Sequence, residues 1–346
     1  MKTRFTALLL SAVLLLELAA CGTAPASQSS GNAASGASSN TSSASSNAED
    51  AGEPVIITNM DRTTEYEKVP QRAIALSYHI AEIMVALGLE DHIIAVASSM
   101  SSLSQVQEKY RDTIGAFPLL EGNYGVPSLE TVLEKNPDFV YGDSYSFYAS
   151  SVGIPEDFDK AGVKIYATEG TFVADATLEN IYADIINIGR IFRVSQRAEE
   201  LVKELRSREA AVRKKVEGLE PVRVFYFDSD TGGGVDMSTI GNIGLQHYLL
   251  TLAGGKNIFD DTDKQFFVTS WEEVIARDPE YIVVCDYYGE GYAEEKIAQM
   301  KTNPETAKME AVQKDRFIIV SGPSMFPSLE NMDAVEQLAA ALHPQK

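Results

Sequence analysis

The residues of this chain that could do chemistry are not spaced as an enzyme would need them. The sequence has no Gly-x-Ser-x-Gly, His-Glu-x-x-His or P-loop pattern. Its four histidines, His79, His92, His247 and His343, are scattered, whereas zinc or manganese carriers need several converging His and carboxylate ligands. We therefore predict a binding protein without a cofactor or a bound bare metal. A surface enzyme that modifies a chelated metal is the alternative from another class.

Aromatic and polar residues gather where apolar runs end, and these residues say more about the function than the scattered histidines do. Aromatic side chains with polar tips suit a large, partly apolar ligand that also offers hydrogen-bond partners. The residues predicted to contact such a ligand are Tyr78, His79, Ser99, Met100, Tyr124, Tyr145, Phe147, Asp228, Phe266, Tyr287, Tyr288 and Met325.

The elements that must position these residues alternate between strand and helix. Apolar runs at 73–76, 93–96, 139–141 and 163–166 are each followed by a helical pattern, and the alternation resumes with runs at 222–227, 281–285 and 317–320. Such alternation predicts an α/β fold with two doubly wound, Rossmann-like lobes. Ligands collect at the carboxyl ends of parallel strands, which is where the aromatic residues fall.

A long amphipathic segment separates the two series of strands. Residues 196–217, after an expected N-cap at Ser195, place apolar residues near helical spacing with charges between them. A helix of this length spans about 30 Å, enough to join two lobes as a single strut.

An internal match supports two similar lobes. The segment 128–140 can be aligned with 270–282, and each reads as a serine N-cap, a glutamate, a short amphipathic turn, a proline and an apolar strand. We therefore expect an N-terminal lobe over 54–193, a joining helix over 194–219 and a C-terminal lobe over 220–346.

The first residues have the features of an export signal. A basic start and an apolar run lead to Leu18-Ala19-Ala20-Cys21, which resembles a bacterial lipoprotein signal over 1–20. That resemblance implies lipid attachment at Cys21, and the Ser, Ala and Gly composition of 21–53 predicts a flexible tether. Cys285, in an apolar run, is expected to be a buried strand residue. The net charge of −21 makes nucleic acid an improbable partner.

Several short phrases together resemble one family, the solute-binding lipoproteins of iron-siderophore, haem and cobalamin ABC importers. The matching phrases are Val69-Pro70-Gln71-Arg72, Ala86-Leu87-Gly88-Leu89, Pro127-Ser128-Leu129-Glu130, Asn136-Pro137-Asp138, Leu252-Ala253-Gly254-Gly255-Lys256-Asn257, Ser270-Trp271-Glu272 and Asp278-Pro279. The resemblance implies two lobes joined by one rigid helix, a ligand held between them, and a permease with its ATPase as partners. It also implies an extracytoplasmic, membrane-anchored protein, which we expect to be monomeric.

The same resemblance assigns a role to two glutamates. Glu130 and Glu272, one on each lobe, match the positions that dock onto arginines of the permease. An exposed carboxylate near each helix N-terminus would let the permease sense how far apart the lobes lie.

The ligand class follows from the charges of the predicted loops. These loops are poor in Arg and Lys, with Lys264 the nearest candidate, and hold several aspartates. Anionic triscatecholate chelates are usually held by several cations, so a neutral or cationic iron chelate such as a hydroxamate siderophore fits better. A corrinoid is an alternative. Haem is another, because Tyr78 or His79 could ligate its iron.

Overall fold

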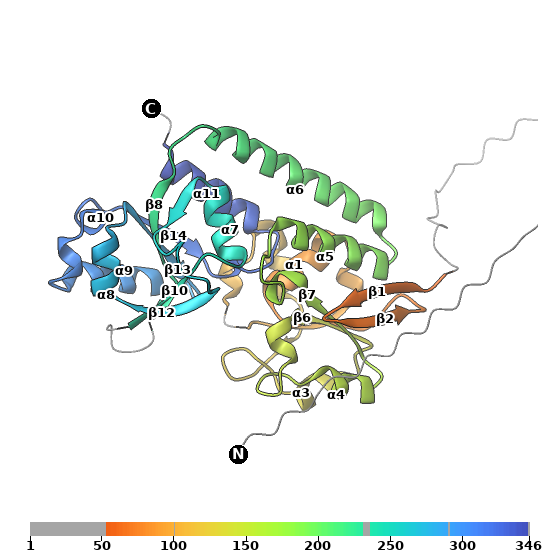
Figure 1. Ribbon diagram of the computed structural model, residues 1–346. Coiled ribbons are helices and arrows are strands. Elements are labelled where there is room, and N and C mark those ends of the chain that lie inside the picture. Colours follow the sequence, from red (N-terminus) through yellow and green to blue (C-terminus); the bar gives the residue numbers. More distant parts are fainter. Residues whose placement is uncertain (1–52, 100, 231–235, 290, 345–346) are drawn as a thin grey trace, which may run out of the picture. The chain divides into compact units, whose positions relative to one another are not determined.

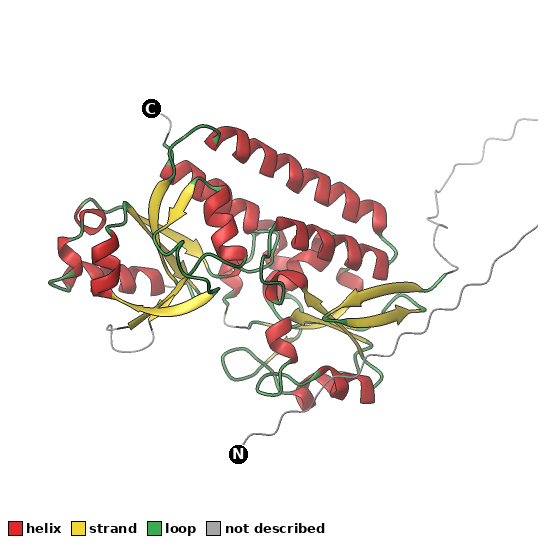
Figure 2. Ribbon diagram, viewed as in Figure 1, coloured by secondary structure: helices red, strands yellow, loops and turns green. Residues whose placement is uncertain are grey.

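Two parallel β-sheets, one from each part of the chain, organise the protein (Figures 1 and 2). The computed structural model describes residues 53–99, 101–230, 236–289 and 291–344. The predicted lipid site at Cys21, the signal and the tether lie outside these ranges, as does Met100. Within the described ranges, no helix has both the length and the apolarity required to cross a bilayer.

The N-terminal lobe contains a five-stranded sheet in the order β5-β4-β3-β6-β7, and all its strands are parallel. The strands are β3 (Ala73–Ala75), β4 (Ile93–Ala97), β5 (Leu119–Leu120), β6 (Phe139–Asp143) and β7 (Lys164–Thr168). Every residue of β3 and β6 is buried, as expected for parallel strands covered on both faces. An antiparallel hairpin of β1 (Val55–Asn59) and β2 (Arg62–Tyr66) precedes the sheet.

Five α-helices belong to the described residues of this lobe. They are α1 (Tyr78–Ala86), α2 (Glu108–Gly115), α3 (Leu129–Leu133), α4 (Pro155–Lys160) and α5 (Leu178–Ile191). Helix α1 begins at Tyr78, because the Ser77 side chain accepts a hydrogen bond from the Ile80 amide and caps the helix. His79 therefore sits in the first turn of a helix rather than in a loop.

The C-terminal lobe contains a four-stranded parallel sheet in the order β11-β8-β13-β14. Its strands are β8 (Val222–Phe227), β11 (Gly255–Asn257), β13 (Tyr281–Asp286) and β14 (Phe317–Ser321). Its helices are α7 (Leu245–Leu252), α8 (Trp271–Arg277), α9 (Tyr292–Thr302), α10 (Glu310–Gln313) and α11 (Asn331–Leu342). Cys285 is fully buried in β13, which confirms the sequence prediction.

A small antiparallel sheet beside it was not predicted. It joins β9 (Ser229–Asp230), β10 (Asp236–Ile240) and β12 (Phe266–Ser270). Phe266, predicted to lie in a loop, is paired with Ile240 in this sheet.

Helix α6 (Ser195–Val216) joins the two lobes and packs on α5 of one and α11 of the other (Figure 1). Its predicted N-cap is wrong, because Ser195 is already helical and the cap residue, Val194, makes no side-chain hydrogen bond. The α5–α6 contact is close: a Cβ atom at Gly189 would lie 2.4 Å from the Cβ of Ala198. At the other end, Arg208 donates to both oxygens of Glu336 on α11 at 2.8 Å. These contacts agree with the predicted strut, and the exact residue boundaries of the lobes remain predictions.

Candidate functional site

A cavity of about 130 Å³ lies between the two lobes at the carboxyl ends of their parallel strands. The N-terminal lobe contributes His79, Ser99, Ser101, Val126, Asp143, Tyr145 and Ser146, and the C-terminal lobe contributes Tyr287, Pro323 and Phe326. Since residues after β3, β4, β6, β13 and β14 meet here, the cavity occupies the place where α/β sheets bind ligands.

A buried pair of polar side chains forms one wall. His79 and Asp143 are 5% and 8% exposed, and His79 Nε2 lies 3.2 Å from Asp143 Oδ2. Thr168 Oγ1 donates to Asp143 Oδ1 at 2.6 Å. With Nε2 facing a carboxylate, Nδ1 of His79 is left as the available acceptor, and it has no protein partner among the described residues. This nitrogen is the kind of buried polar atom that a ligand donor would satisfy.

Tyr287 forms the opposite wall. Its hydroxyl donates to Asp228 Oδ1 at 2.6 Å, and its ring lies 6.2 Å from that of Phe326. Burial raises the pKa of Tyr287 well above its ordinary value, so the phenol stays neutral. Lys296 is close to Asp228, and its Nζ donates to the backbone carbonyls of Asp228 and Cys285 at 2.7 Å each.

Direct contacts hold the lobes together around the cavity. Gln105 Nε2 of the N-terminal lobe donates to the Asp286 carbonyl at 2.7 Å. Gly170 packs so closely on Pro327 that an added Cβ would lie 2.9 Å from the proline ring. Pockets for drug-sized ligands measure roughly 300–1,000 Å³. A ligand of that size therefore requires these contacts to separate.

Four of the predicted ligand residues line the cavity: His79, Ser99, Tyr145 and Tyr287. Asp228 reaches it only through the hydroxyl of Tyr287. Tyr124 and Tyr288 are exposed, at 71% and 42%, and are not among the lining residues.

Three of the other predicted ligand residues are buried and are not among the lining residues. Phe147 and Met325 are 1% and 0% exposed and lie in hydrophobic core clusters, and Tyr78 is 8% exposed in the core as well. Phe147 and Met325 sit in single 3-10 turns, Ser144–Phe147 and Pro323–Met325, which direct their side chains into the lobes. Phe266 belongs to β12 and packs against the core.

The lining residues outside the predicted contact set are Ser101, Val126, Asp143, Ser146, Pro323 and Phe326. Asp143 and Phe326 belong to the loops in which the sequence predicts the ligand site, and Asp143 ends an apolar strand at the ligand-binding edge. Ser101, Val126, Ser146 and Pro323 depend on loop geometry that the sequence pattern does not express.

Glu130 and Glu272 occupy equivalent places on the two lobes. Each is the second residue of a helix whose serine N-cap is in place: Ser128 accepts from Thr131 N at 3.1 Å, and Ser270 accepts from Glu273 N at 3.4 Å. Both glutamates are exposed. Backbone hydrogen bonding and Ser270 lower the pKa of Glu272, which keeps it ionised.

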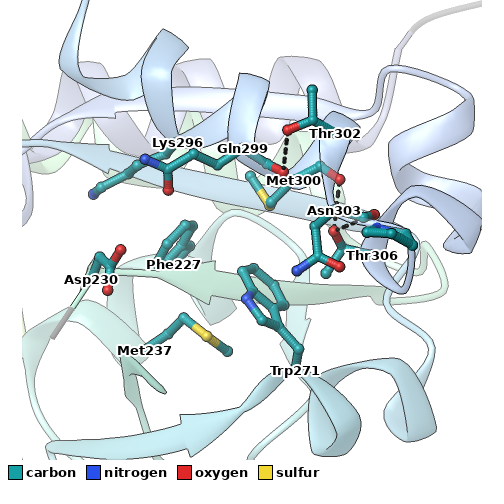
Figure 3. Close-up of a pocket in the computed structure, with 11 residues that line it drawn as sticks. Phe227, Asp230, Met237, Trp271, Lys296, Gln299, Met300, Thr302, Asn303 and Thr306 are labelled. Atoms are coloured by element: carbon teal, nitrogen blue, oxygen red, sulfur yellow. Dashed lines mark hydrogen bonds between the residues drawn. The ribbon is translucent and has the colours of Figure 1, made fainter. Parts of the chain in front are cut away.

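A second cavity, of about 530 Å³, lies within the C-terminal lobe (Figure 3). Phe227, Met237, Trp271 and Met300 give it an apolar lining, and Lys296 lies at its side. All its lining residues come from one lobe, so closure of the lobes would not act on it. Across the described ranges, no cluster of three or more His, Cys, Asp or Glu residues could hold a metal ion.

Comparisons with known proteins identify relatives over most of the chain. A family model described as periplasmic binding protein matches residues 74–322. The vitamin B12-binding protein of Vibrio campbellii is 26% identical over 212 residues, covering 61% of this chain and 70% of the relative. An uncharacterized ABC transporter substrate-binding lipoprotein of Bacillus subtilis is 25% identical over 342 residues, covering 98% and 96%. The structure of an ABC-type Fe3+-hydroxamate transport system from Saccharomonospora viridis is similar, with a TM-score of 0.70, 25% identity and coverage of 84% and 99%.

Proposed function

This chain belongs to the periplasmic binding protein family and is a substrate-binding protein of ABC importers rather than an enzyme, and we propose that it captures a neutral or cationic iron chelate, such as a ferric hydroxamate, in the cavity between its lobes. The chelate is then delivered unchanged to a permease that an ATPase drives. A corrinoid is the second candidate, favoured by the relatives that bind vitamin B12.

The proposed ligand class rests on the charge of the cavity wall. Ten described residues line the cavity and none of them is Lys or Arg, while Asp143 presents a buried carboxylate. A strongly anionic chelate would meet this carboxylate without a neutralising cation, which is costly in a partly desolvated site. A neutral chelate avoids that cost, and its hydroxamate or amide groups can bond to the serine, tyrosine and histidine side chains.

Isothermal titration calorimetry of the purified protein tests this ligand class. The titrants are a neutral ferric hydroxamate, cyanocobalamin, haem and an anionic ferric triscatecholate. We expect saturable binding of the hydroxamate and none of the triscatecholate at the same concentration. Preferential binding of the triscatecholate would refute the charge argument, and exclusive binding of cyanocobalamin would select the corrinoid.

The membrane anchor is part of the same proposal. The Leu18-Ala19-Ala20-Cys21 sequence and the lipoprotein name of one relative support lipid attachment at Cys21. Mass spectrometry of the protein from its own membranes should find a diacylglyceryl group on Cys21. A Cys21→Ser variant should then be recovered in the soluble fraction, and an unmodified Cys21 in the native protein would contradict the anchor.

A further inference from the structure

Two carboxyl groups are buried against each other between the lobes. Glu82 lies on α1 of the N-terminal lobe and is 0% exposed, and Glu330, directly before α11 of the C-terminal lobe, is 5% exposed. Their side chains hydrogen-bond to each other. Glu82 Oε1 also accepts from the Gln107 amide at 2.7 Å, whereas no N–H or hydroxyl donor of the described residues reaches Oε2. A hydrogen bond between two carboxyl groups requires a proton, so at least one of them is a carboxylic acid.

The surrounding charges act on the pair in opposite directions. Protonated His79 favours the ionised form of Glu82, whereas the charge of Asp333 favours the protonated form of both Glu82 and Glu330. Arg208 on α6 is held by Asp333 and Glu336.

On the neighbouring helix α2, Arg111 Nη2 donates to the carbonyls of Ser104 and Val106. The charge of Arg111 is not among those that act on Glu82 or Glu330. Burial raises the pKa of Glu82 to about 7, and burial together with the Glu82 charge raises that of Glu330 to about 9.

The position of the pair connects it to the ligand cavity. Glu82 follows His79 by three residues on α1, so the two side chains share a helix face, and His79 lines the cavity. Glu330 follows the turn that carries Pro323 and Phe326, which also line it. Separation of the lobes to admit a ligand would draw these two segments apart and give both carboxyl groups access to water.

We propose that Glu82 and Glu330 form a proton-dependent latch between the lobes: the closed arrangement holds a proton that the open arrangement releases. Raising the pH therefore opens the ligand cavity. In water both groups ionise near their ordinary value of 4.5, whereas the closed pair keeps its protons to higher pH. Closure is thus fully favoured in acid and is weakened as the pH rises toward 9. The ratio of closed to open protein falls about tenfold per pH unit for each proton released.

Single-molecule Förster transfer between one dye on each lobe measures this ratio without a ligand, so the test does not depend on the proposed substrate. Dyes are attached in the full chain with Cys21→Ser, Lys160→Cys and Lys308→Cys. Both lysines are well exposed, with side-chain exposures of 74% and 69%. Cys285 is fully buried and does not compete for the label.

We expect the distance between the lobes to increase from pH 5 to pH 9 in this parent protein. Glu330→Gln should weaken the response and favour the closed lobes, because the amide donates to Glu82 at every pH and Glu82 alone still titrates. Glu82→Gln should act likewise and provides an independent variant if the first does not fold, as judged by circular dichroism. Asp184→Asn is the matched control, since Asp184 is fully buried but bonds only to Tyr166 and Glu169 within one lobe. The latch would be overturned if the distance between the lobes of the parent protein did not change with pH. It would also be overturned if a folded Gln variant retained the parent's response.

Discussion

His79 Nε2 lies 3.2 Å from Asp143 Oδ2, and this contact ties together the carboxyl ends of two adjacent parallel strands at the wall of the ligand cavity. His79 follows β3, and Asp143 ends β6. The carboxylate fixes the orientation of the imidazole and leaves negative charge beside the cavity. The contact therefore serves both the shape and the electrostatics of the proposed site.

Removing that charge should change the preference for charged ligands. In Asp143→Asn, the affinity for a monocationic ferric hydroxamate should fall about tenfold, a loss of roughly 1.4 kcal/mol. The affinity for a neutral hydroxamate of similar size should change much less. Calorimetry with the two chelates measures the difference, and equal losses for both would show that Asp143 acts on the structure of the site rather than on ligand charge.

Charge reversal at the two equivalent helix starts should prevent delivery but not capture. Glu130→Arg combined with Glu272→Arg should abolish uptake of labelled chelate by cells and leave the affinity in solution unchanged, because both residues are exposed and outside the cavity. Glu121→Arg with Glu294→Arg makes the same change in net charge at other exposed positions. Equal loss of uptake in that control would attribute the effect to net charge alone.

The close contact between α5 and α6 should tolerate no added methyl group. Gly189→Ala places a Cβ 2.4 Å from that of Ala198 and should lower the free energy of unfolding by about 1–3 kcal/mol. Adding Ala198→Gly should recover part of this loss, although glycine in a helix costs about 1 kcal/mol itself. Urea denaturation of the two single variants and the double variant forms a double-mutant cycle, and purely additive losses would mean that the two residues do not meet.

Cys285 should be inert in the folded protein. Burial raises the pKa of its thiol from 9.0 to about 12, so the reactive thiolate is scarce at pH 8, and the side chain is also inaccessible. Ellman's reagent should titrate no thiol in native Cys21→Ser protein and one in urea. Rapid native reaction would contradict the placement of β13 in the core.

The sequence was sufficient to predict the parallel sheets, the joining helix and the edge at which the cavity lies, because these depend on hydrophobic periodicity. The serine caps at 128 and 270 were predicted for the same local reason. The orientation of Phe147 and Met325 was not, since single 3-10 turns at the strand ends decide it. Glu82 carried a signal that was missed: it is a lone carboxyl within a run of apolar residues on α1.

The most direct test of the account is a crystal structure of the protein with a neutral ferric hydroxamate bound. We predict that the chelate lies between the lobes and contacts His79 and Tyr145 on one side and Tyr287 on the other. A chelate bound in the cavity of the C-terminal lobe, beside Trp271 and Met300, would contradict the central claim.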